Sequence, residues 1–114
     1  MRRSVAAVIA AMAVIATPSA YAAVLPPADP ATGNGLYANC TSPELSYQLL
    51  CISYIAGATD VLVRLGITCR PYGVTYRQMM DIVVAKLKDD AISRHLASSA
   101  LMMKYEAAAF PCHK

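Results

Sequence analysis

Four cysteines carry most of the chemistry that this chain could perform: Cys40, Cys51, Cys69 and Cys112. In a reducing compartment they would suggest metal binding or thiol catalysis. In an oxidising compartment an even number of cysteines in a short chain indicates disulfides. Zinc ligands usually come in pairs two to four residues apart, and no two of these cysteines are that close. We therefore expect no metal site and no cofactor.

The first 22 residues have the features of an export signal, which places the cysteines in an oxidising compartment. Arg2–Arg3 provides a positive start, Ser4–Ala16 is an apolar stretch, and Ala20–Tyr21–Ala22 is a small-x-small cleavage signature. The apolar stretch is too short for a membrane-spanning helix. We predict cleavage after Ala22 and two disulfides in the exported protein.

The chain is long enough for one small domain. We divide its 114 residues into a signal peptide (1–22), a flexible lead-in (23–34) and a helical domain (35–114). Loss of Arg2–Arg3 lowers the formal charge from +3 to +1. That balance gives no electrostatic reason to expect binding to nucleic acid or to an anionic membrane. Each disulfide would add about 2–4 kcal/mol to the stability of so small a domain.

The clearest element is a long helix, which Ser42 is suited to cap and Gly66 to end after Leu65. Its small and polar residues form one narrow stripe on an otherwise apolar helix, so we expect a central helix, buried on most sides. The stripe consists of Ser46, Ser53, Gly57, Asp60 and Arg64. A glycine inside a helix costs about 0.5–1 kcal/mol. Gly57 therefore indicates the close approach of another backbone, from the same chain or from a dimer partner.

Three further helices are expected, and no convincing strand is present, so the predicted fold class is all-α. The first spans about residues 35–40. The next begins at Thr75, which fits a capping box with Gln78, and fades by Asp89 because acidic residues oppose the dipole at a helix C-terminus. The last spans residues 98–109 and ends before Pro111. The prediction is a small four-helix domain with two disulfides.

Four cysteines permit three pairings. Cys69 lies shortly before the third helix and Cys112 lies just after the fourth, so an antiparallel hairpin of these helices would bring the two together. This arrangement favours Cys69–Cys112 and leaves Cys40–Cys51, whose short reach is feasible if residues 41–44 turn back.

His95 is the residue that could most readily belong to a catalytic set, because Ser98, Ser99 and the pair Asp89–Asp90 are close in sequence. No Gly-x-Ser-x-Gly elbow surrounds either serine, and adjacent carboxylates rarely face one reacting centre. Gly33–Asn34–Gly35 is interpreted as a turn and not as a phosphate cradle. We expect no enzymatic activity, with a small hydrolase as a third hypothesis.

Three segments carry a family resemblance. Residues 51–60 are similar to a Cys-x-x-Tyr-Ile-x-Gly-x-x-Asp helix, residues 69–78 to a Cys-x-Pro-x-Gly-Val-Thr-x-x-Gln segment, and residues 94–112 to a closing part that starts with Arg-His-Leu and ends with Phe-Pro-Cys. In this order they resemble the Rap/Tai family of type VI secretion immunity proteins over nearly all of residues 35–112. Besides the cysteines, the residues that match the family's motifs are Tyr54, Gly57 and Asp60 in the helix, Thr75 and Gln78 at the cap, and Arg94 and His95 in the loop.

The resemblance implies a small periplasmic protein, often a homodimer, that binds a peptidoglycan amidase effector. Such an amidase is a Cys–His enzyme, so a protruding loop could block its cleft without chemistry. The loop between the last two helices carries the candidate contacts, which are Asp90, Ile92, Arg94 and His95. This loop also departs from the family at Asp90, Ala91 and Ala97. A solvated connector is the alternative interpretation of the loop, and a chaperone-like or structural periplasmic protein is the alternative function.

Overall fold

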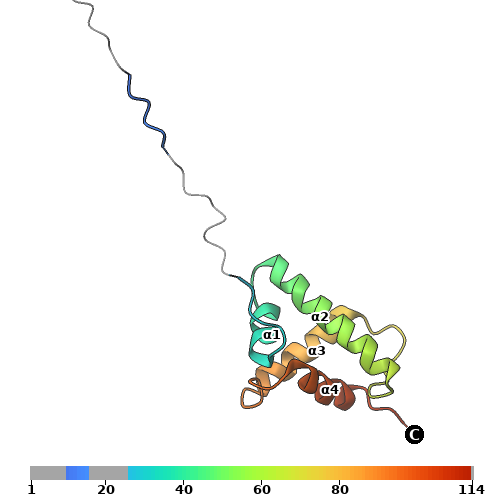
Figure 1. Cartoon of the computed structure of the whole chain (residues 1–114). Helices are drawn as coiled ribbons and strands as arrows, with labels where there is room; N and C mark the ends of the chain where they lie inside the picture. Colours follow the sequence, from blue (N-terminus) through green and yellow to red (C-terminus); the bar gives the residue numbers. More distant parts are fainter. Residues whose placement is uncertain (1–9, 16–25, 114) are drawn as a thin grey trace, which may run out of the picture.

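A computed structural model describes residues 10–15 and 26–113 (Figure 1). This part of the chain forms four helices and no strand, as predicted: α1 (Gly33–Cys40), α2 (Leu45–Arg64), α3 (Tyr76–Asp89) and α4 (Ser98–Ala109). The predicted signal peptide and its cleavage site lie largely outside the described residues.

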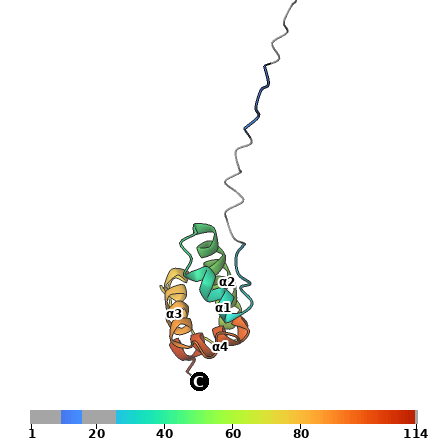
Figure 2. The same ribbon diagram turned by 90° about the vertical axis from the view of Figure 1, so that its left-hand side faces the viewer.

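Every helix contacts the other three, so one core lies between them. Figures 1 and 2 show α2 along one side, the pair α3 and α4 across it, and α1 at the end where α4 begins. Each helix contributes fully buried side chains to the core, among them Leu36, Ile55, Met79, Leu87 and Met102. The four-helix fold follows from the burial of these apolar faces against one another.

The ends of two helices confirm the expected signals. The Thr75 hydroxyl accepts a hydrogen bond from the Gln78 backbone N–H over 3.1 Å and so caps α3. Gly66 follows α2 with a φ of +68°, a left-handed conformation that favours glycine. The N–H groups of Gly66 and Ile67 donate to the Val63 and Leu62 carbonyls, as in a Schellman motif.

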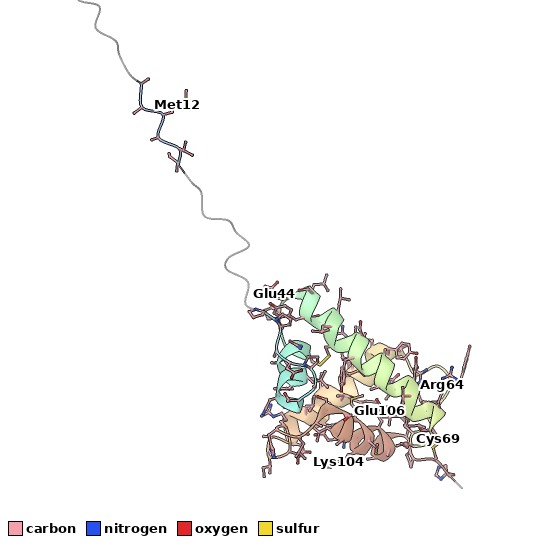
Figure 3. The ribbon with its side chains drawn as sticks, in the orientation of Figure 1. Met12, Glu44, Arg64, Cys69, Lys104 and Glu106 are labelled. Atoms are coloured by element: carbon pink, nitrogen blue, oxygen red, sulfur yellow. A yellow bond between two sulfur atoms is a disulfide. The ribbon has the colours of Figure 1, made fainter. Side chains whose placement is uncertain are left out.

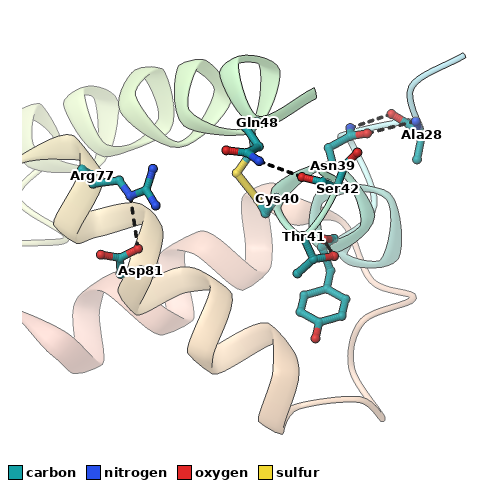
Figure 4. The surroundings of a disulfide bond; sticks show 10 residues. Ala28, Asn39, Cys40, Thr41, Ser42, Gln48, Arg77 and Asp81 are labelled. Carbon is teal, nitrogen blue, oxygen red and sulfur yellow. Dashed lines mark hydrogen bonds and ion pairs between the residues drawn. A yellow bond between two sulfur atoms is a disulfide. The ribbon is translucent and has the colours of Figure 1, made fainter. Parts of the chain in front are cut away.

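The predicted cap of α2 is wrong. The helix begins at Leu45, and its N-cap is Glu44, whose side chain makes no capping bond. Ser42 instead accepts from the Glu44 N–H within the preceding turn, and its carbonyl accepts from the Gln48 side chain over 2.8 Å (Figure 4). The helix starts late because residues 41–44 turn back to allow the Cys40–Cys51 disulfide.

The chain before residue 35 also differs from the prediction. Gly33–Asn34–Gly35 is the first turn of α1, capped by Thr32, whose hydroxyl accepts from the Gly35 N–H over 3.1 Å. Upstream, the Asn39 side chain exchanges two hydrogen bonds with the Ala28 backbone, at 3.1 and 2.8 Å (Figure 4). The packed structure therefore extends into the expected lead-in, because these buried polar groups require partners.

Both predicted disulfides are present. Cys40–Cys51 has a Cα–Cα distance of 5.1 Å and Cys69–Cys112 one of 5.0 Å, which leaves no cysteine free. The second bridge is accompanied by a hydrogen bond from the Cys69 N–H to the Phe110 carbonyl over 2.9 Å. It joins the start of the α3 segment to the end of α4, as expected for an antiparallel hairpin.

The prediction that α2 is buried on most sides is wrong, because the helix is buried on one side only. Its buried residues are Cys51, Ile55, Thr59 and Leu62. The predicted stripe is exposed, and so are Leu45, Leu49, Val61, Val63 and the C-cap Leu65. Three short helices cover only one side of a 20-residue helix, and its remaining apolar surface faces outward. By length and composition alone α2 could cross a membrane, but here it contacts all three other helices.

Candidate partner-binding loop

Residues 90–97, which we call the α3–α4 loop, contain the four predicted contact residues. Two successive turns shape it: the Ser93 N–H donates to the Asp90 carbonyl over 3.1 Å, and the Leu96 N–H donates to the Ser93 carbonyl over 2.9 Å. Ile92 lies in the first turn with 89% of its surface exposed. An isoleucine in this position offers apolar surface that the fold does not use.

His95 is exposed beside Ile92. Its Nδ1 lies 2.9 Å from the Ile92 carbonyl oxygen. A carbonyl oxygen can only accept, so Nδ1 carries the proton, and Nε2 of the neutral ring is an acceptor. This bond orients the imidazole and leaves Nε2 free to accept a hydrogen bond from another group.

Asp90 anchors one end of the loop to α4. Its Oδ2 accepts from Lys104 Nζ over 3.0 Å and from the Tyr105 hydroxyl over 2.9 Å. These hydrogen bonds, that of Lys104 first, hold the pKa of Asp90 below its ordinary value. Burial of the ring, followed by the bond to Asp90, raises the pKa of Tyr105 to about 12. Figure 3 labels Lys104 on α4, on the outer side of the domain.

Arg94 anchors the other end of the loop to α1. Its guanidinium carbon lies 4.6 Å from the centroid of the Tyr37 ring, a cation–π arrangement. The side chain is half-buried, and its Nε is buried without a hydrogen-bond partner among the described residues. Arg94 therefore contacts its own domain, although the sequence suggested it as a contact with the effector.

Backbone hydrogen bonds fix the same end of the loop. The first helical N–H groups of α1 have no partner inside the helix, and those of Gly33 and Asn34 donate to the Leu96 and Arg94 carbonyls. A Cβ on Gly33 would lie 2.7 Å from the Arg94 carbonyl oxygen, so only glycine allows this approach. This role of Gly33 was not predicted from the sequence, although Thr32 before two closely spaced glycines is a helix-start signal.

The motif residues of α2 lie elsewhere, along a groove of about 510 Å³ between α2 and α4. Tyr54 and Gly57 line it from α2, and Met102 and Met103 line it from α4. No atom of residues 10–15 and 26–113 lies within 4 Å of a Cβ built on Gly57, so the close approach of another of the four helices, one of the two expected explanations, is wrong.

Other candidate residues are structural. Asp60 accepts from the Tyr76 hydroxyl over 2.7 Å and so joins α2 to α3. Thr75 caps α3 with its hydroxyl, whereas Gln78 contributes its backbone N–H and its side chain makes no capping bond among the described residues. Of the two serines in the suggested hydrolase set, Ser98 is fully buried and Ser99 is exposed, and among the described residues neither hydroxyl is hydrogen-bonded to His95, whose Nδ1 is bound to the Ile92 carbonyl. In residues 10–15 and 26–113 no group of three His, Cys, Asp or Glu side chains is placed to hold a metal ion.

Comparison with known protein families supports the resemblance seen in the motifs. The model of the Rap1a immunity proteins matches residues 32–112, well over half of the chain. The chain belongs to the Rap1a immunity protein family. No match is found among curated proteins or among solved structures. The matched region starts at the N-cap of α1 and ends at Cys112, so it includes both disulfides and the α3–α4 loop.

Membership of the Rap1a family gives the protein a role in immunity, which means binding to an effector protein. The family and the paired cysteines are consistent with a location outside the cytoplasm.

Proposed function

We propose that this Rap1a immunity protein acts in the periplasm, where it binds a type VI secreted peptidoglycan amidase and sterically blocks its active site. The observation that carries the proposal is the α3–α4 loop, which holds Ile92 outward and 89% exposed on a domain stapled by two disulfides. A convex, apolar protrusion fits a concave enzyme cleft. Export through the predicted signal peptide would bring the protein to the compartment where cell wall is cleaved.

Occlusion requires no reaction by the immunity protein itself. The loop offers the exposed apolar side chains of Ile92 and Leu96, one imidazole acceptor and backbone carbonyls, and its two charged side chains are engaged by its own domain. These groups suit binding and give no activated nucleophile. We therefore propose that the protein is not an enzyme and acts only while it is bound.

We also propose that the protein is a homodimer, joined through the groove between α2 and α4. Gly57 lies on α2 with open space around it, so its cost in helix stability of about 0.5–1 kcal/mol is not offset by a close contact with any part of the chain that the structure describes. Exposed Val61, Leu65 and Met103 line or flank the groove on both sides. A second copy presents the same apolar face, and a two-fold axis near Gly57 would let the two helices approach closely.

The test is a pull-down of the oxidised exported protein against a panel of purified peptidoglycan amidase effectors, followed by an activity assay on peptidoglycan. Ile92→Asp is the informative variant, and Leu45→Asp, an equally drastic change on exposed α2, is its matched control. We expect tight stoichiometric capture and loss of amidase activity for wild type and L45D, and neither for I92D. Capture of none of the amidases would refute this target and favour the chaperone-like or structural alternative.

A further inference from the structure

We propose that the α3–α4 loop is a preformed plug, in which Ile92 is the anchor for an apolar recess of the partner while Asp90 and Arg94 are positioning residues. The proposal rests on the proposed function for the existence of the recess. It reassigns two of the four residues that the sequence suggested as contacts. The evidence is the set of bonds that each residue makes within its own domain.

The loop is held at both ends by different helices. At its start, Asp90 is bound by Lys104 and Tyr105 of α4. At its end, the Arg94 and Leu96 carbonyls accept the first N–H groups of α1, at 2.6 and 3.0 Å. A loop tied at two points to a packed core loses little conformational entropy on binding, because most of that entropy was lost on folding.

The side chains of the two positioning residues are directed at the domain. Tyr105, which donates to Oδ2 of Asp90, is 3% exposed, so this bond ties Asp90 to the core. The Arg94 guanidinium stacks on Tyr37. A partner that used Asp90 Oδ2 or the stacked guanidinium of Arg94 as its main contact would compete with these interactions, and the affinity would fall by that cost.

The part of the α3–α4 loop that is available to a partner is its apex, around Ile92 and His95. Ile92 and Ala91 are exposed, Leu96 is 45% exposed, and the only polar side-chain group oriented outward by a bond within the loop is the His95 imidazole. The chemistry that recognises this surface is an apolar recess with a hydrogen-bond donor at its edge for Nε2. A large apolar side chain in a desolvated pocket is the usual anchor of such an interface.

The positioning role is tested on the free protein, without any partner. Hydrogen exchange is measured for the amides of Ser93, Leu96, Gly33 and Asn34, whose bonds define the loop. Asp90→Ala is compared with Asp89→Ala, an adjacent acidic residue that makes no side-chain bond among the described residues. We expect exchange at least about tenfold faster in D90A and unchanged in D89A. Equal rates in the two variants would overturn the positioning role.

The anchor role is tested by affinity for the captured amidase. We expect Ile92→Ala to weaken binding at least about tenfold. Asp90→Ala should weaken binding by slowing association. The affinity lost in D90A/I92A should be smaller than the product of the two single losses, because Ile92 contributes less once the loop is no longer held in position. Tyr105→Phe should show the same coupling, with Tyr47→Phe as control, since the Tyr47 hydroxyl is buried without a partner among the described residues.

Two outcomes would contradict the proposed roles of Ile92 and Asp90. Full affinity of Ile92→Ala would show that the apex is not seated in a recess, and strictly multiplicative losses in D90A/I92A would make Asp90 an independent contact. If no amidase binds the wild-type protein, the proposed function and the anchor fail together. The hydrogen-exchange comparison still decides whether the loop is preformed, so the two failures are distinguishable.

Discussion

Thr59 of α2 donates its hydroxyl to Oε1 of Glu106 of α4 over 2.6 Å, and both side chains are completely buried. The second carboxyl oxygen, Oε2, has no partner among the described residues. Figure 3 labels Glu106 on α4, between that helix and α2. Burial raises the pKa of Glu106 above its ordinary value, against the opposing effects of the Thr59 bond and then of Arg70. Burial at the α2–α4 contact therefore favours the protonated form of this carboxyl.

The raised pKa of Glu106 predicts that the domain loses stability as the pH rises. A group whose pKa is raised in the folded state contributes its full stability below the pKa of the unfolded chain and loses it as the pH passes through the folded pKa. Chemical denaturation should be measured between pH 4 and pH 8. The free energy of unfolding should begin to fall as the pH rises above the ordinary pKa of a glutamate carboxyl.

Glu106→Gln should remove this dependence, since the amide keeps an acceptor for Thr59 and does not ionise. At pH 8 the variant should be more stable than wild type. Glu44→Gln is the matched control, because Glu44 is the other glutamate of the chain and is exposed. An unchanged pH profile in E106Q would contradict the prediction.

The disulfides should differ in their contributions. Cys69–Cys112 closes a loop with a sequence separation of 43, and Cys40–Cys51 one of 11. Loop-closure entropy predicts a stabilisation of about 4 kcal/mol for the longer loop and about 3 kcal/mol for the shorter. Urea unfolding of each single-bridge variant, oxidised and reduced, isolates one bond at a time. A larger loss on reducing Cys40–Cys51 would reverse the expected order.

The fold was predictable where local chemistry decides it. Thr75 and Gly66 are cap and stop signals with a physical mechanism, and the pairing of Cys69 with Cys112 follows from one antiparallel hairpin. The exposed face of α2 was not predictable, because a helix that is apolar nearly all round does not reveal which of its faces the other helices cover. That choice is made by tertiary contacts.

The sequence predicts that the candidate contact residues share one loop, but not what each side chain contacts. The sequence places Ile92 and Arg94 in one loop, yet only the structure shows the first exposed and the second stacked on Tyr37. The stacking joins residues far apart in the chain, and no local pattern encodes it. The contact between Gly33 and the loop was not predicted for the same reason, since the carbonyl that excludes a side chain at Gly33 belongs to Arg94, far away in the sequence.

Gly57 offers a test of the dimer with two substitutions. Gly57→Ala should stabilise the folded monomer by about 0.5–1 kcal/mol, because the site is helical and has open space within the chain. Gly57→Leu should leave the domain folded but weaken self-association at least about tenfold, because the side chain would separate the two helices. Sedimentation velocity over a range of concentrations measures this. Equal self-association of wild type and G57L would show that α2 does not join two copies at this point.

Gly33→Ala should have the opposite effect on stability from Gly57→Ala, although both glycines are helical. A methyl group on Gly33 would meet the Arg94 carbonyl oxygen and the Leu101 side chain, so either α1 or the α3–α4 loop must shift. Overpacking of this kind costs about 1–3 kcal/mol. Chemical denaturation gives the stability, and hydrogen exchange at Asn34 and Leu96 reports the loosened loop. A G33A variant as stable as wild type, with unchanged exchange, would show that α1 and the loop are not in close contact in solution.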